Sequence, residues 1–142
     1  MKMDLEQIKA IIPHRDPFIL IDRITVNESL KETIAEKDVT ENEFWVPGHF
    51  PGHPVMPGVL MVEAMAQTGA VNILTLPQYQ GKIGYFSSIQ DVKFKRKVVP
   101  GDTLIIKAKY LSQRAAFFFF EGEAFVNQDL VCVARFSVAV AS

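Results

Sequence analysis

The stretch from residue 57 to residue 76 constrains the fold of this chain more than any other. It opens with Pro57-Gly58 and then places apolar side chains on nearly every face of a helix, whereas a surface helix carries them on one stripe. Proline is favoured at the first helical position, because the N–H it lacks would have no intrahelical partner there. The sequence therefore predicts a helix that starts at Pro57 or Gly58 and is surrounded by protein. Its apolar members are Val59, Leu60, Met61, Val62, Ala64, Met65, Ala66, Ala70, Val71, Ile73 and Leu74.

A run this long and apolar also raises the question of a membrane span. Polar residues interrupt it at Glu63, Gln67 and Asn72, and no basic cluster flanks it. We therefore expect a buried helix and no membrane segment.

The rest of the chain predicts strands. Residues 18–26, 31–39, 82–87, 89–98, 103–111, 115–126 and 130–140 are β-branched, aromatic or alternating, and residues 4–11 fit a short helix capped by Asp4. Short turns join the last three strands, which predicts an antiparallel meander. The expected fold is α+β, with an antiparallel sheet wrapped around one long buried helix. One such sheet covers only part of the helix, and the phenylalanine run 117–120 is apolar on both strand faces, so a homodimer at least is expected.

Composition sets the broad class. The chain has 142 residues, is 49% hydrophobic and carries a formal net charge of −1, which fits one domain over residues 1–142 and gives no nucleic-acid footprint. Its single cysteine, Cys132, cannot form an internal disulfide, and the N-terminus does not resemble a secretory signal. A cytosolic location is expected.

A stiff loop precedes the helix and carries His49. Pro47, Pro51, Pro54 and Pro57 fix the backbone on either side of it, so a potential base is held in place. The simpler interpretation is a loop histidine that hydrogen-bonds its neighbours. His53 lies four residues later, but the prolines exclude a regular helix and no third ligand is near, so no metal site is expected. His14, in the loop sequence PHRDP, is interpreted as structural.

Glu63 is the unusual residue of the helix. A carboxylate among apolar side chains is costly unless it is paired or neutral. It shares a helix face with Gln67, four residues on, whose amide can orient it. The alternative is an ion pair with an arginine, for which Arg15, Arg23 and Arg96 are available.

The start of the helix supplies a third element. The N–H groups of Gly58 and Val59 have no acceptor within the helix and can bind developing negative charge. A base at His49, an acid at Glu63 and this anion site suit proton abstraction beside a carbonyl, or loss of a hydroxyl from the next carbon. The residues by themselves support acid–base lyase or isomerase chemistry.

The sequence GHFPGHPVMPGVLMVEAMAQ, with PHRDPFILIDRI before it and KFKRKVVPGD after it, resembles the bacterial 3-hydroxyacyl-acyl-carrier-protein dehydratases of type II fatty acid synthesis. The similarity extends over nearly the whole chain. It implies the hot-dog fold, an acyl carrier protein as partner, no metal or organic cofactor, and dimers that assemble as a trimer of dimers. Departures are Asp16, where an aromatic residue is frequent, and the strand sequence IQDVKFKRKV.

The resemblance also implies roles for particular residues. His49 would take the α-proton of the thioester, and Glu63 of the partner subunit would assist loss of the 3-hydroxyl. Gln67 would orient Glu63, and the Gly58 amide would polarise the carbonyl. Tyr85 and Phe86 match the aromatic segment at the mouth of the acyl tunnel.

A basic cluster on one predicted strand allows two interpretations. Its members are Lys93, Lys95, Arg96 and Lys97. They are either the solvated face of the strand or a docking surface for the acidic carrier protein.

Three other functions stay open at this point. Some relatives also isomerise the trans-2 product to cis-3, and hot-dog thioesterases hydrolyse similar substrates with a helix carboxylate. The non-enzymatic alternative is an acyl-binding or scaffold protein.

Overall fold

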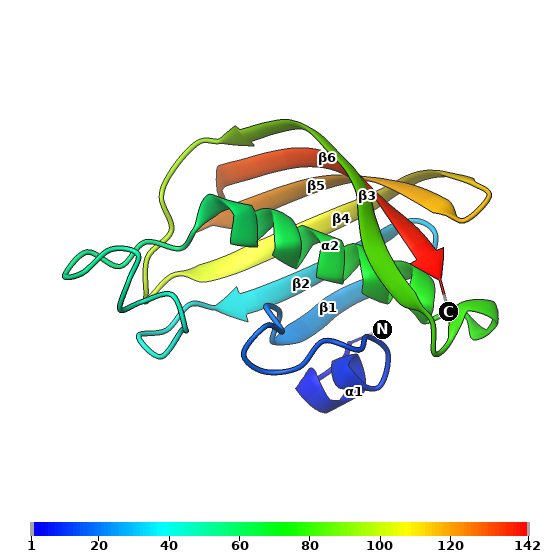
Figure 1. The fold of residues 1–142 in the computed structure, drawn as a ribbon, viewed down its shortest axis with the longest axis horizontal. Coiled ribbons are helices and arrows are strands. Elements are labelled where there is room, and N and C mark those ends of the chain that lie inside the picture. The colour runs from blue at the N-terminus through cyan, green and yellow to red at the C-terminus, as the bar shows by residue number, and fades with distance from the viewer. Residues whose placement is uncertain (1, 142) are drawn as a thin grey trace.

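The computed structural model describes residues 2–141 and contains one six-stranded sheet in the order β1-β2-β4-β5-β6-β3, with every neighbouring pair antiparallel (Figure 1). The long helix α2 lies across one face of this sheet (Figure 1). The predicted fold class is thereby confirmed. The elements are α1 (Leu5–Lys9), β1 (Arg23–Glu28), β2 (Glu32–Asp38), α2 (Gly58–Leu74), the short 3₁₀ helix η1 (Pro77–Tyr79), β3 (Ile83–Phe94), β4 (Thr103–Arg114), β5 (Phe117–Val126) and β6 (Asp129–Ala141).

The meander predicted for the last three strands is present as β4-β5-β6. Asn127 and Gln128 form the two-residue turn between β5 and β6, both with positive φ, as a tight hairpin requires. On β5, the even-numbered residues from Phe118 to Val126 are buried, as the alternation predicts. Gly122 allows α2 to approach the sheet closely, because a Cβ at this position would lie 2.6 Å from Met65 Sδ.

The sheet and the segment before β1 together cover α2 except along one stripe. Val59 is 69% exposed, and Glu63 and Ala66 are half-buried. These positions recur every three or four residues and so share one face of the helix. The sequence predicted that α2 is buried on every side. Within one chain, this is true of every face of the helix except this one.

Three predicted strands, 18–26, 82–87 and 89–98, differ clearly from the observed ones. The first begins at Arg23 and not at Phe18, because Phe18 O and Leu20 N hydrogen-bond to the side chain of Gln67 instead of to a neighbouring strand. The segments 82–87 and 89–98 form one strand, β3, which has two register shifts against β6 and ends at Phe94. Bulges of this kind add local twist, which sequence alternation does not record.

No helix within residues 2–141 has the length and hydropathy needed to cross a membrane.

A buried asparagine joins the C-terminal half of α2 to the β1–β2 hairpin. Asn72 accepts a hydrogen bond from Leu30 N at 2.9 Å and donates to Thr33 Oγ1 and Glu28 O at 3.1 and 3.3 Å. Replacement of Asn72 by alanine removes three hydrogen bonds, one of them to the side chain of the buried Thr33. We expect a loss of about 1–3 kcal/mol in the free energy of unfolding, measured by urea denaturation. An unchanged denaturation midpoint would contradict this role.

Candidate active site

His49 is held by its backbone and by its ring. Its N–H donates to Trp45 O at 2.9 Å, and its carbonyl accepts from Val55 N at 2.7 Å. The ring atom Nδ1 lies 2.7 Å from Val55 O. A carbonyl can only accept, so Nδ1 carries the proton and donates it to this bond. In the neutral imidazole, Nε2 then keeps its lone pair and is free to act as a base.

The loop that carries His49 is fastened at both ends. Near its start, Lys37 Nζ lies 3.2 Å from Glu43 Oε1, and both side chains are about nine-tenths buried. At its end, Met56 N donates to Val98 O at 2.8 Å. These contacts, together with the buried ring of Trp45, fix the loop on the sheet.

The first turn of α2 faces the same hollow as His49. Pro57 is the N-cap residue and provides no side-chain cap, and the N–H groups of Gly58 and Val59 have no acceptor within residues 2–141. His49, Gly58 and Val59 all line one hollow of about 540 Å³. The structure thus brings the predicted base and the predicted anion site together.

Gly58 lies directly against the ring of Phe94. A Cβ there would lie 2.7 Å from the Phe94 ring, which lines the same hollow. The absence of a side chain at Gly58 therefore allows Phe94 to pack against the start of α2.

Gln67 and Glu63 are in direct contact, as their spacing on the helix predicts. Gln67 Nε2 donates to Glu63 Oε2 at 3.0 Å and to Phe18 O at 2.8 Å, while Gln67 Oε1 accepts from Leu20 N at 2.8 Å. Because a backbone N–H only donates and a carbonyl only accepts, the orientation of the buried amide is fixed. Gln67 therefore presents an N–H donor to the carboxyl group.

The arginine alternative for Glu63 is wrong in this structure. Arg96 pairs with Asp129, and Arg15 donates to backbone carbonyls. Arg23 pairs with Glu36 and Asp38, and its hydrogen bonds hold the pKa of the Asp38 carboxyl below its usual value.

Glu63 instead has a neighbour that the sequence analysis missed. His14 Nε2 lies 3.5 Å from Glu63 Oε2, a contact that the interpretation of His14 as structural did not include. No sequence signal identified it, since His14 lies in an irregular loop with no periodicity.

Glu63 lines a different hollow from His49 within one chain. This second hollow, of about 390 Å³, is bounded by α2, β3 and the loop after α1. Its lining includes Tyr85, Phe86 and His14 besides Glu63. The predicted acid and the predicted tunnel-mouth aromatics are therefore together, and the predicted base is elsewhere.

The four residues of the basic cluster do not all line the same hollow in the folded chain. Lys95, Arg96 and Lys97 line the hollow of His49, whereas Lys93 is exposed on β3 and does not. Arg96 Nη1 lies 2.7 Å from Asp129 Oδ2, so part of its charge is neutralised locally.

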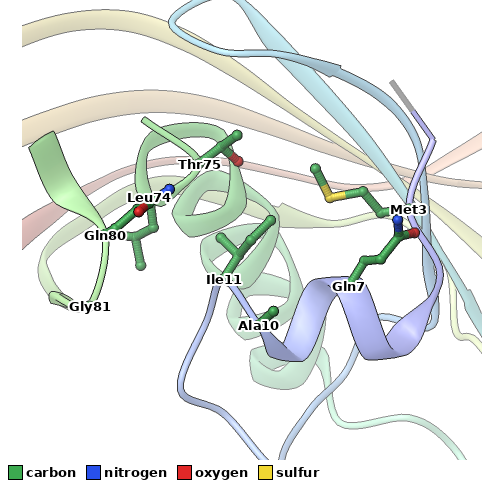
Figure 2. Close-up of a pocket in the computed structure, with 8 residues that line it drawn as sticks. All are labelled: Met3, Gln7, Ala10, Ile11, Leu74, Thr75, Gln80 and Gly81. Atoms are coloured by element: carbon green, nitrogen blue, oxygen red, sulfur yellow. The ribbon is translucent and has the colours of Figure 1, made fainter. Parts of the chain in front are cut away.

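A third hollow lies at the other end of α2, beside α1 (Figure 2). Figure 2 places Gln7, Ile11 and Thr75 around it, and no side chain that lines it is an acid, a base or a cation. It therefore offers no acid–base chemistry. Within residues 2–141, no three His, Cys, Asp or Glu side chains are grouped as a metal site would require.

Comparison with known proteins places this geometry in a family. The family model described as "FabA-like domain" matches residues 12–135. The chain belongs to the FabA-like family.

Similar FabA-like relatives share close to half of the sequence. The chain is 47% identical to a 3-hydroxyacyl-[acyl-carrier-protein] dehydratase FabZ of Desulforamulus reducens, over 97% of each chain. It is 48% identical to the protein of the same name from Roseiflexus castenholzii, over 92% of this chain and 91% of the relative. The structure titled "The Dehydratase Heterocomplex ApeI:P from Xenorhabdus doucetiae" superposes with a TM-score of 0.80 and 21% identity, covering 95% of this chain and 91% of the other. That structure supports the fold alone.

Proposed function

We propose that this protein dehydrates 3-hydroxyacyl thioesters of acyl carrier protein to trans-2-enoyl thioesters in fatty acid biosynthesis, in the cytoplasm and without a metal or organic cofactor. One observation carries the proposal most directly. An imidazole with a free Nε2 and two unpaired helix N–H groups line one hollow. The FabZ dehydratases at 47–48% identity support the same reaction.

In the proposed mechanism, the thioester carbonyl accepts a hydrogen bond from Gly58 N–H, assisted by the Val59 amide. This contact stabilises the charge that develops on the carbonyl oxygen as His49 Nε2 removes the α-proton. The electron pair of the broken C–H bond forms the C2–C3 double bond and expels the 3-hydroxyl. Glu63 gives that hydroxyl a proton, so the leaving group is water. The hydrogen bond from Gln67 Nε2 holds the Glu63 carboxyl group in its orientation toward the 3-hydroxyl.

The acid and base that act together come from two chains in this proposal. In one chain His49 and Glu63 line separate hollows. Strand β3 lies at the edge of the sheet, and the uncovered stripe of α2 is beside it. A long edge strand with exposed apolar side chains is a ready site for pairing. The exposed apolar side chains of β3 are Tyr85, Phe86, Ile89 and Phe94. We therefore propose a homodimer formed through this face, with three dimers in the full assembly.

The acyl chain of the substrate would enter the hollow that Glu63 lines. Tyr85 and Phe86 line this hollow, and Ala66 and Ala70 leave room along the helix. Most of the lining is apolar, as a fatty acyl chain requires.

Lys95, Arg96 and Lys97 would receive the acidic carrier protein, with Lys93 at the edge of the surface. Their position around the hollow of His49 supports this role. We expect Lys95→Glu with Arg96→Glu to raise KM for carrier-bound substrates by about 10-fold or more, since like charges slow encounter. Short thioester analogues should be unaffected. Lys31→Glu with Arg114→Glu, two exposed charges away from the hollow, is the matched control. Equal loss on both kinds of substrate would contradict carrier docking.

One assay tests the proposed function as a whole. The protein is incubated with a 3-hydroxyacyl carrier protein, and enoyl thioester, free thiol and cis-3 product are measured. The enoyl thioester is the expected product. Free thiol without enoyl product would mean hydrolysis, and unchanged substrate would mean binding alone; either result would overturn the proposal.

A further inference from the structure

A second imidazole lies beside Glu63 and has no part in the mechanism above. His14 Nε2 is 3.5 Å from Glu63 Oε2, and the exposed fractions of the two side chains are 21% and 18%. His14 Nδ1 is buried and has no hydrogen-bond partner within residues 2–141. A buried ring nitrogen without a partner calls for an explanation, because most buried polar atoms are paired.

The unpaired Nδ1 determines which form of the ring fits. A charged imidazolium, or a neutral ring with its proton on Nδ1, would bury an N–H without an acceptor. An unpaired buried N–H is rarer in proteins than an unpaired acceptor. The neutral ring with its proton on Nε2 leaves only a lone pair unpaired, and it points an N–H donor toward Glu63.

The Gln67 amide and the His14 ring then lie against the same oxygen of the carboxyl group, the first by a hydrogen bond and the second by a longer contact. Gln67 Nε2 donates to Glu63 Oε2, and His14 Nε2 approaches the same atom. Glu63 Oε1 has no hydrogen-bond partner in the described part of the chain. An oxygen that already accepts from Gln67 and faces the His14 ring at 3.5 Å is a poor place for an acid proton, so Oε1 is the better position for it.

We propose that His14 is a positioning residue for Glu63, which directs the carboxyl proton onto Oε1 and stabilises the carboxylate left after that proton has moved to the 3-hydroxyl. This inference rests on the proposed dehydration. The negative charge on Glu63 appears only as the proton departs, so the contact is stronger in the transition state than with bound substrate. Loss of such a contact lowers kcat and leaves KM nearly unchanged.

No lysine or arginine lines the hollow of Glu63 in the described part of the chain. The titratable side chains that line this hollow are His14, Glu63 and Tyr85. Arg15 is next in the sequence, but its guanidinium donates to the carbonyl oxygens of Lys9, Ile12 and His14.

Three substitutions at one position test the proposal. His14→Leu removes the donor, and we expect kcat to fall about 10- to 100-fold, at or below the loss typical of a direct donor to a developing anion. His14→Gln keeps an N–H at a similar reach and should retain most of the activity. His14→Asn is polar but too short to reach Glu63, so it should lose as much as His14→Leu. Equal kcat for the Gln and Asn variants would overturn the proposal. This comparison does not depend on the Leu variant, so it remains a test if that variant does not fold.

A double-mutant cycle separates positioning from a general structural role. In a Glu63→Gln protein no carboxylate forms, so His14→Leu should change the residual rate by less than about 2-fold. A full loss in that background would show that His14 acts elsewhere. His53→Leu, which removes an exposed imidazole outside this hollow, is the control and should match the wild type. If the wild type forms no enoyl product, the proposed function fails; if it does and His14→Leu keeps its kcat, only this inference fails.

Discussion

Replacement of His49 by alanine is expected to lower kcat for dehydration by about 10²- to 10⁴-fold, the usual contribution of a positioned general base. The reason lies in the hydrogen bond from Nδ1 to Val55 O, which leaves Nε2 unprotonated in the neutral ring. No second base lines the hollow of His49, whose other titratable members are Lys95, Arg96 and Lys97. The measurement is enoyl thioester formation at saturating substrate.

The backbone of residue 49 needs no imidazole to keep its place. Its N–H and carbonyl are bonded to Trp45 and Val55. The alanine variant should therefore fold, and its thermal unfolding checks this. His53→Ala, in the same loop but outside this hollow, is the matched control and should keep the wild-type rate. Activity of His49→Ala within about 3-fold of the wild type would remove His49 from the mechanism, since a general base contributes far more.

Replacement of Glu63 by glutamine is expected to cause a loss of similar size, because the amide cannot give a proton to the leaving hydroxyl. The sharper experiment mixes the two inactive variants. If each site takes its base from one chain and its acid from the other, a mixed dimer of His49→Ala and Glu63→Gln chains has one intact site and one doubly altered site. Random reassociation makes about half of the dimers mixed, so about a quarter of the wild-type activity should return.

The mixing experiment has a clear contrary outcome. If base and acid of a site come from the same chain, no pairing of the two variants restores a site, and the mixture stays inactive. The control is the same procedure applied to each variant alone, which should recover nothing. A dimer through β3 and the uncovered stripe of α2 predicts recovery, since Glu63 lies on that stripe.

Local patterns in the sequence predicted most of the elements correctly. The helix was expected from Pro57 or Gly58 and is observed over Gly58–Leu74. The buried face of β5 followed its alternation, and the short turn between β5 and β6 is formed by Asn127 and Gln128. These features depend on residues a few positions apart, which share one short-range geometry.

The start of the first strand was predicted too early for a non-local reason. Phe18 to Asp22 has the composition of a strand, but the backbone of Phe18 and Leu20 is bound by Gln67. A side chain on the central helix thus replaces a strand partner. The same hydrogen bonds fix the amide of Gln67, which donates to Glu63. Gln67 therefore accounts both for the late start of β1 and for the contact made by the Glu63 carboxyl group.

The sequence by itself determined which groups this protein has for chemistry: an imidazole on a proline-rich loop, two free amides at a helix start, and a carboxyl group with an amide one turn later. These groups are close in the sequence, so their local geometry could be predicted. Only the tertiary structure decided how they are grouped. His49 joins Gly58 in one hollow, and Glu63 joins His14 in another. The physical reason is that each hollow is closed by elements distant in sequence, β3 and the loop after α1, whose positions depend on packing against the sheet and α2.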